Sequence, residues 1–277
     1  MAAQLALALY PASDIDEALA LHAASAGAEA RGAVFTRPEV VEGILDLCGY
    51  TEDVDLARKR LLEPSSGDGE FVVAAVRRLA RAAEREGLDL RSWATDLQTA
   101  IVAVELHEDS HSRTTERVRD VLTEAGLHTH EADALCRAWL RRGDFLTIDI
   151  EGPFDFAVGN PPYVRQERIP PRLLELYRRR YATMYDRADL YVPFFERSLE
   201  LLGPTGVLGF ICANRWIKNK YGAPLRQLVS SGFHLEAYID LQGVDVFSDT
   251  VDAYAAVTVI RRGGSGPTVV VTDATRA

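Results

Sequence analysis

The residues best suited to chemistry form one tetrapeptide, Asn160-Pro161-Pro162-Tyr163, directly after the apolar stretch 154–159. The two prolines fix φ and remove two N–H donors, so the turn holds its carbonyls and the Asn160 amide in one direction. Tyr163 adds a flat aromatic face beside them. This combination of rigid hydrogen-bond acceptors and a stacking surface suits the exocyclic amine of a planar base. The structural alternative is a proline-rich turn with a half-buried tyrosine.

A glycine-rich turn, residues 63–71, follows a short predicted strand and opens a strongly patterned helix. Strand, glycine turn and helix together form the nucleotide-binding corner of a doubly wound fold. A dinucleotide site would need a glycine where this chain has Val72, and it avoids acids near the pyrophosphate. This turn instead carries Glu63, Asp68 and Glu70, which suit a ligand with a cationic end, such as the ammonium and sulfonium of S-adenosylmethionine. The alternative is a glycine-rich turn that binds nothing.

Two further strand ends carry residues that fit a nucleoside. Residues 100–105 read as a buried strand ending in Glu105, a carboxylate placed to accept both hydroxyls of a ribose. Asp144 and Phe145, in a predicted strand-end loop, could hold the amine and the ring face of an adenine. Earlier in the chain, the Phe35-Thr36 loop precedes a helix and could bind an anionic group at the N-terminus of that helix.

The segment from His107 to His111 matches the His-Glu-x-x-His pattern of zinc enzymes. Thr114 and Arg117 stand where the extended form of the pattern has Gly and His. The pattern also begins two residues after a strand-end acid, where a sheet protein simply starts its next helix. We therefore expect no metal site.

The hydrophobic pattern predicts an alternation of strands and helices, and hence an α/β fold. Residues 86–99 are harder to interpret and could be an inserted loop or a short helix. The predicted strands are 60–63, 100–105, 154–159, 206–211, 234–241 and 253–260. The predicted helices are 13–30, 39–48, 72–85, 109–125, 130–141, 189–202 and 223–230.

Composition excludes several classes of protein. The 277 residues contain no apolar run near the roughly 18 that a membrane span needs, and the short apolar start lacks a basic flank, so we expect neither a membrane partner nor a signal peptide. Three widely spaced cysteines indicate reduced thiols rather than a disulfide framework. A cytoplasmic location is expected.

Charge is unevenly distributed along the chain. The net charge of −10 argues against a generic nucleic-acid coat, but residues 164–226 contain 12 Lys/Arg against 6 Asp/Glu. A basic segment directly after the tetrapeptide could track phosphates around the site, although a solvated basic face is an equal alternative. The candidates for backbone contacts are Arg165, Arg168, Arg215, Lys218 and Lys220.

Taken together, these motifs resemble the N6-adenine DNA methyltransferases of the gamma arrangement, the catalytic module of type IIG-like restriction-modification and related phage-defence enzymes. The match covers about residues 33–260, in the order that family uses. Asn160-Pro161-Pro162-Tyr163 matches its catalytic motif, and Phe247 falls where the family places an aromatic that stacks on the flipped base. The resemblance implies S-adenosyl-L-methionine as cofactor. The implied cofactor-binding residues are Phe35, Thr36, Glu63, Pro64, Ser65, Gly67, Gly69, Glu105, Leu106, Asp144 and Phe145.

The resemblance also implies a fold and a mechanism. The fold would be the class I methyltransferase sheet of seven mostly parallel strands, with one antiparallel strand near its edge. The target adenine would be flipped out of double-stranded DNA, and its N6 hydrogens would bond to the Asn160 side-chain oxygen and the Pro161 carbonyl. Tyr163 and Phe247 would sandwich the ring. No catalytic histidine or strong base is implied, because the amine needs orientation more than deprotonation.

The expected organisation is an N-terminal helical extension (1–32), a methyltransferase catalytic domain (33–265) and a C-terminal strand or tail (266–277). Members of the family usually carry a target-recognition domain after the catalytic module, whereas 17 residues follow Ile260 here. We therefore expect recognition, and any nuclease, to come from a partner subunit or from outside this segment. Two alternatives remain: an N5-glutamine protein methyltransferase, whose family also uses Asn-Pro-Pro-Tyr, and a non-catalytic S-adenosylmethionine-binding subunit of a defence complex. RNA methylation is a smaller alternative.

Overall fold

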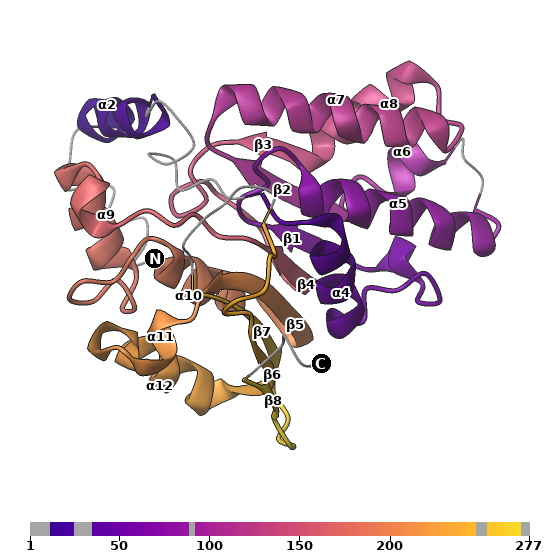
Figure 1. The fold of residues 1–277 in the computed structure, drawn as a ribbon. Coiled ribbons are helices and arrows are strands. Elements are labelled where there is room, and N and C mark those ends of the chain that lie inside the picture. The colour runs from indigo at the N-terminus through magenta and orange to yellow at the C-terminus, as the bar shows by residue number, and fades with distance from the viewer. Residues whose placement is uncertain (1–11, 25–34, 89–91, 248–253, 273–277) are drawn as a thin grey trace.

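The computed structural model describes residues 12–24, 35–88, 92–247 and 254–272 (Figure 1). One eight-stranded sheet runs through it, in the order β3-β2-β1-β4-β5-β7-β6-β8. The strands are β1 (Leu61–Glu63), β2 (Ile101–Glu105), β3 (Leu140–Arg142), β4 (Phe154–Gly159), β5 (Leu202–Ala213), β6 (Phe233–Asp240), β7 (Ala255–Arg262) and β8 (Val269–Val271). Strand β7 is antiparallel to both of its neighbours, and all other pairs are parallel.

Helices cover both faces of the sheet (Figure 1). One face carries α4 (Pro38–Cys48), α5 (Glu70–Arg85), α6 (Trp93–Asp96), α7 (Glu108–Glu124) and α8 (Thr129–Trp139). The other carries α2 (Ala12–Ala23), α9 (Pro171–Arg180), α10 (Tyr191–Leu201), α11 (Arg215–Lys218) and α12 (Ala223–Gly232). Single 3₁₀ turns occur at η1 (Leu56–Arg58), η2 (Gln166–Arg168) and η3 (Lys220–Gly222).

The double covering explains why the strands read as continuous apolar runs instead of alternating ones. Adjacent residues Leu61 and Leu62 of β1 are both fully buried, but they belong to hydrophobic clusters on opposite faces. In the described part of the chain, no helix is long and apolar enough to cross a membrane.

The expected number of seven strands is wrong, because β8 adds an eighth beside β6. The predicted helix 130–141 is also too long: α8 ends at Trp139, and Leu140–Arg142 is strand β3, paired with β2. A three-residue strand is too short to show a period of its own, so it merged with the preceding helical pattern.

The other predicted elements are confirmed with shifts of a few residues, and β5 is longer at both ends. Helix α9 was not predicted, because the segment was interpreted by its run of arginines and not by the helical spacing of its buried residues Leu173, Leu176 and Tyr177. The predicted helix 13–30 is seen as α2, which ends at Ala23; residues 25–30 of the prediction lie outside the described residues.

The sheet order places a crevice at one defined point. The chain moves outward in one direction from β1 through β2 to β3, and in the other direction from β4 onward. In doubly wound folds, ligands bind outside the carboxyl ends of the strands at this topological switch point. The carboxyl ends of β1, β2 and β4 are where the glycine turn, Glu105 and Asn160 lie.

A close approach between α4 and β5 depends on Gly209. A Cβ atom at this position would lie 2.2 Å from Cys48 Sγ and 3.1 Å from Ile44 Cγ2. Both neighbours are buried in the core, so an added methyl group must displace one of them. We expect Gly209→Ala to lower the free energy of unfolding by about 1–3 kcal/mol, as measured by urea denaturation.

Gly43, on the same helix α4, is the matched control, because a Cβ there would meet nothing within 4 Å. Gly43→Ala should leave the free energy of unfolding unchanged or raise it by up to about 1 kcal/mol, as usual within helices. In a Cys48→Ala background the penalty of Gly209→Ala should shrink, since the nearest clashing atom is gone. An equal penalty in both backgrounds would show that this contact is not the cause.

Candidate active site

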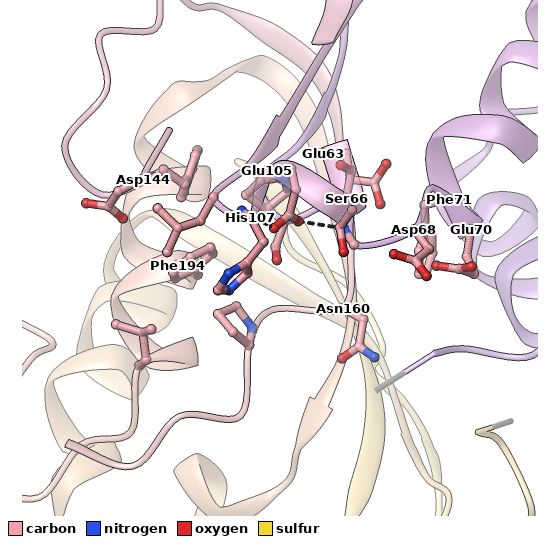
Figure 2. Close-up of a pocket in the computed structure, with 18 of the residues that line it drawn as sticks. Glu63, Ser66, Asp68, Glu70, Phe71, Glu105, His107, Asp144, Asn160 and Phe194 are labelled. Atoms are coloured by element: carbon pink, nitrogen blue, oxygen red, sulfur yellow. Dashed lines mark hydrogen bonds between the residues drawn. The ribbon is translucent and has the colours of Figure 1, made fainter. Parts of the chain in front are cut away.

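A cavity of about 390 Å³ opens at the carboxyl ends of β1, β2 and β4. Ten of the eleven cofactor-binding residues expected from the sequence line it: Phe35, Thr36, Glu63, Pro64, Ser65, Gly67, Glu105, Leu106, Asp144 and Phe145. Asn160, which Figure 2 labels, and Pro162 of the tetrapeptide line the same cavity. The fold therefore joins the predicted nucleotide corner to the predicted catalytic motif.

Gly69 is the expected residue that does not line the cavity. Its φ of 96° is in the left-handed region, and a Cβ atom there would lie 3.1 Å from the Thr114 side chain of α7. Thr114 Oγ1 in turn donates a hydrogen bond to the Gly67 carbonyl at 2.9 Å. Gly69 thus shapes the turn and lets α7 pack closely, while the neighbouring residues face the cavity.

Glu105 is held rigidly at the end of β2. Its Oε2 accepts the Gly67 N–H and its Oε1 accepts the His107 N–H, each at 2.8 Å (Figure 2). Burial raises the pKa of the Glu105 carboxyl to about 7, although these backbone donors act in the opposite direction. Each oxygen keeps a second lone pair for a hydroxyl donor.

Glu63 is a buried carboxylate with an unused oxygen. Its side chain is 1% exposed, and Oε2 has no hydrogen-bond partner among the described residues. Burial, followed by the charges of Glu70 and Glu105, raises the pKa of Glu63 well above its usual value. A buried carboxylate is costly unless a cation or donor meets it, so this wall favours a cationic ligand.

The nearby arginines do not remove this excess of negative charge. Arg113 pairs with Asp68 at 2.8 Å and Arg117 pairs with Glu70 at 2.9 Å, and all four side chains are partly exposed. Neither arginine forms a hydrogen bond or ion pair with Glu63 or Glu105 in the described structure. Acceptor oxygens therefore dominate the inner wall.

The Asp144 end of the cavity combines an acceptor with aromatic rings. Asp144 Oδ1 accepts the Leu146 N–H at 3.0 Å, while Oδ2 is buried and has no hydrogen-bond partner at ordinary distance within the described residues. The charge of Asp144 also reaches the Tyr177 hydroxyl, whose pKa is raised mainly by burial. The rings of Phe145 and Phe194 lie 5.1 Å apart at 38°, so an amino group and a flat ring can both be accommodated here.

Helix α2 supplies a wall that the motifs did not predict. His22 is 7% exposed and lines the cavity, and burial lowers its pKa although Asp144 acts in the opposite direction. His107 Nδ1 donates to the Ala23 carbonyl at 2.9 Å and so ties the end of α2 to the start of α7. His107 thus lies before helix α7, at its N-cap, and lines the cavity.

Further lining residues were also missed: Ser66, Phe71, Ser110, Arg113, Gly143, Val164, Leu190 and Phe194. Ser66 and Phe71 lie within the glycine-rich turn and could have been included. Phe194 lies in an ordinary amphipathic helix, α10, and nothing in its local sequence marks it.

The tetrapeptide leaves the sheet as predicted. Gly159 ends β4 with a φ of 152°, a conformation that favours glycine, and the next residue is the predicted catalytic Asn160. Asn160 Nδ2 donates a hydrogen bond to Thr36 Oγ1 at 3.2 Å. The Tyr163 ring is half-buried, and its hydroxyl has no hydrogen-bond partner in the described part of the chain.

The structure brings Tyr163 and Phe247 together, but not as a sandwich. Their ring centroids lie 6.3 Å apart and the planes meet at 83°, edge to face. Phe247 is 4% exposed. A base can enter between these rings only if they separate, so their expected role in binding a base stays a prediction.

The five expected backbone-binding residues, Arg165, Arg168, Arg215, Lys218 and Lys220, are all exposed. Burial raises the pKa of the Asp189 carboxyl, and the charges of Arg215 and Arg165 act in the opposite direction. Other arginines of the basic segment are structural: buried Arg197 donates to the carbonyls of Phe145 and Ile148, and Arg226 donates to that of Trp216. The number of basic residues available to bind phosphates is therefore smaller than the 12 Lys/Arg of residues 164–226 indicate.

Comparison with known proteins identifies the family. The family model of the Eco57I restriction-modification methylase matches residues 53–247. The type II methyltransferase M.PaeR7I of Pseudomonas aeruginosa is 52% identical over 267 residues, which cover 95% of this chain and 45% of that protein. The type II methyltransferase M.XhoI of Xanthomonas vasicola is 53% identical, with 84% of this chain and 42% of that protein covered. The chain thus spans less than half the length of these relatives.

Solved structures confirm the fold class. The type IIG restriction endonuclease BpuSI superposes with a TM-score of 0.60 over 86% of this chain and 26% of its own, at 16% identity. This degree of likeness shows the fold alone. The sheet order and the neighbours show a class I S-adenosylmethionine-dependent methyltransferase fold, and with the family match over residues 53–247 the chain belongs to the Eco57I restriction-modification methylases.

Proposed function

We propose that this chain transfers a methyl group from S-adenosyl-L-methionine to the N6 amine of a flipped adenine in double-stranded DNA, as part of a restriction-modification system. The observation that carries the proposal is one acidic cavity that ends on Asn160 and Pro162. Membership of a restriction-modification methylase family and relatives that are type II methyltransferases support DNA as the substrate.

The residues of the cavity fit S-adenosylmethionine. The buried Oε2 of Glu63, which has no hydrogen-bond partner among the described residues, suits the ammonium group. The fixed oxygens of Glu105 suit the two ribose hydroxyls, and Asp144 Oδ2 suits the adenine amine. Phe145 and Phe194 offer apolar faces to the adenine ring. The cofactor, when bound, supplies an electrophilic methyl group on a sulfonium.

The catalytic motif would orient the target amine. Asn160 Oδ1 and the Pro161 carbonyl would each accept one N6 hydrogen, which draws the nitrogen lone pair out of conjugation with the ring and directs it toward the cavity. Tyr163 offers the face on which the base stacks, with Phe247 on its other side after the two rings separate. Rate enhancement would come from positioning and fixed dipoles, so the site needs no strong base.

Phosphate contacts would position the DNA without reading its sequence. Arg165, Arg168, Arg215, Lys218 and Lys220 are exposed and form the proposed backbone-binding rim. The relatives are more than twice as long as the matched segments. We propose that sequence choice, and any nuclease, reside outside residues 33–265, in a further segment or a partner subunit.

Calorimetric titration with S-adenosylmethionine, in the presence and absence of adenine-containing duplex DNA, tests the proposal. Cofactor binding is expected, with tighter binding when DNA is present. Transfer of a tritiated methyl group to unmethylated genomic DNA, followed by nucleoside analysis, should give N6-methyladenine. Label in protein glutamine, or in no acceptor at all, would refute the DNA substrate, and absence of cofactor binding would refute the whole assignment.

A further inference from the structure

One short segment, Thr36–Arg37, contacts all three parts of the site. Thr36 is 2% exposed and lines the cofactor cavity, and its hydroxyl bonds to the predicted catalytic Asn160. Its backbone forms an isolated antiparallel bridge with Phe247, the predicted base-stacking residue. The segment therefore lies where the cofactor wall, the amide and the aromatic pair meet.

The bond to Thr36 fixes the plane of the Asn160 amide. An amide rotates about its last side-chain bond with little torsional preference, and only a bond to one of its ends selects an orientation. With Nδ2 directed at Thr36 Oγ1 at 3.2 Å, Oδ1 is turned to the opposite side of the amide. An acceptor for a base amine is needed at that oxygen, so the orientation matters for the proposed transfer.

Arg37 holds the segment that carries Phe247. The Arg37 N–H donates to the Val246 carbonyl at 3.0 Å, and its Nε donates to the Phe247 carbonyl at 3.2 Å. The guanidinium also pairs with Asp245. Three successive residues, 245–247, are thus bound by one arginine.

This attachment determines where the Phe247 ring can go. The ring is buried and meets Tyr163 edge to face, so a base can stack on Tyr163 only after Phe247 turns or shifts. The two hydrogen bonds from Arg37 are to backbone carbonyls and do not depend on the ring's rotamer. Phe247 can therefore rotate while its backbone stays beside the base site.

Building on the proposed function, we propose that Thr36 and Arg37 are positioning residues for methyl transfer. Thr36 orients the Asn160 amide, and Arg37 keeps the 245–247 segment at the base site when the aromatic pair opens. Both act through another residue, so their loss should reduce the rate or DNA affinity and leave cofactor binding largely intact.

The first test uses Thr36→Val, which keeps the shape of the side chain but removes the hydroxyl, and Thr36→Ser, which keeps the hydroxyl. Thr36 lines the cavity, but its hydroxyl accepts the hydrogen bond from Asn160, so in the full-length protein Thr36→Val should slow single-turnover methyl transfer about 10–100-fold and change the cofactor Kd far less. Thr36→Ser should restore most of the rate. Equal losses in both variants, or a loss of cofactor affinity with an unchanged rate, would overturn the role of the hydroxyl.

A second readout of Thr36 does not depend on turnover. The Nδ2 protons of Asn160, assigned in an amide NMR spectrum by their absence in Asn160→Ala, should exchange with water slowly in the wild type and in Thr36→Ser. They should exchange faster in Thr36→Val. Insensitivity of these protons would refute the inference even if transfer occurs, whereas absence of transfer in the wild type would refute the proposed function alone.

The Arg37 contacts are tested by amide hydrogen exchange. Arg37→Ala should accelerate exchange in residues 244–247 and raise the KM for DNA about tenfold, with the cofactor Kd nearly unchanged. Arg58→Ala is the matched control, because Arg58 forms an exposed ion pair with Asp55 at 3.2 Å away from the site, and it should change neither quantity. Unchanged exchange of residues 244–247 in Arg37→Ala would overturn the proposal.

Discussion

Asn160→Ala is expected to lower the rate of methyl transfer by about 10²–10³-fold or more, because it removes the acceptor that orients the target amine. Asn160 borders the cavity but makes its described hydrogen bond to Thr36, so the cofactor should still bind with a Kd within about threefold of the wild type. Single-turnover transfer of a labelled methyl group measures the first effect, and calorimetry measures the second.

Tyr163→Phe provides the control for this prediction. The Tyr163 hydroxyl is buried without a hydrogen-bond partner in the described residues, so its removal should cost no stability and should leave the stacking face intact. Tyr163→Ala should lower the rate, because the face is lost. If Asn160→Ala lost transfer and cofactor binding together, the amide would be a structural or cofactor-binding group, and the assigned role would fail.

Glu105→Ala is expected to weaken cofactor binding by about 1–3 kcal/mol, or roughly 5–150-fold in Kd, because charged hydrogen bonds to the ribose hydroxyls are lost. The same substitution also frees the N–H groups of Gly67 and His107, which Glu105 holds at 2.8 Å. Glu105→Gln retains the shape of the side chain and removes the charge, but its amide can accept only one of these two N–H groups. Calorimetric titration of the three proteins measures the Kd values.

The pKa of Glu105, raised to about 7 by burial, adds a pH dependence with a defined sign. Ribose hydroxyls donate to the carboxylate, so binding favours the deprotonated form and lowers the pKa in the complex. Cofactor affinity should therefore rise as the pH increases toward about 7 and level off above it, with a slope of at most tenfold per pH unit below.

In Glu105→Gln this part of the pH dependence should disappear. The remaining slope would come from Glu63, whose pKa is also raised by burial, from His22, whose pKa is lowered by burial, and from the amino group of the cofactor itself. A Glu63→Gln, Glu105→Gln double variant should show a smaller rise of affinity between about pH 6 and 7 than Glu105→Gln alone. If the wild type showed a flat profile over the same range, neither carboxyl could titrate on binding.

The sequence by itself determined the features that arise locally. A doubly wound sheet is specified by three local features. These are the alternation of strands and helices, the glycine turn, and buried strands that lead into Glu63, Glu105 and Asn160. Because parallel strands present their carboxyl ends at one edge, residues read at those ends meet in one cavity, and ten of the eleven expected cofactor residues line it.

Only the tertiary structure decided which distant segments complete the site. The structure brings His22 near Asp144, Phe194 against Phe145, and Thr36 to Asn160, and each pair is separated by more than 30 residues in the sequence. The local patterns around His22, Phe194 and Thr36 are those of ordinary helices and loops. The short strands β3 and β8 likewise depend on the strands they pair with.

The orientation of the rings and the pKa values within the site also depend on the tertiary structure. Tyr163 and Phe247 were expected to face each other across a base; the bridge from Thr36 and the bonds from Arg37 hold the backbone of Phe247 beside Tyr163, and the two rings meet edge to face. The raised pKa values of Glu63 and Glu105 arise first from burial and then from neighbouring carboxylates: Glu70 and Glu105 act on Glu63, and Asp68 acts on Glu105. Residue types and their order specify which groups are present, whereas packing fixes their distances, their orientation and their access to water, and these set the chemistry.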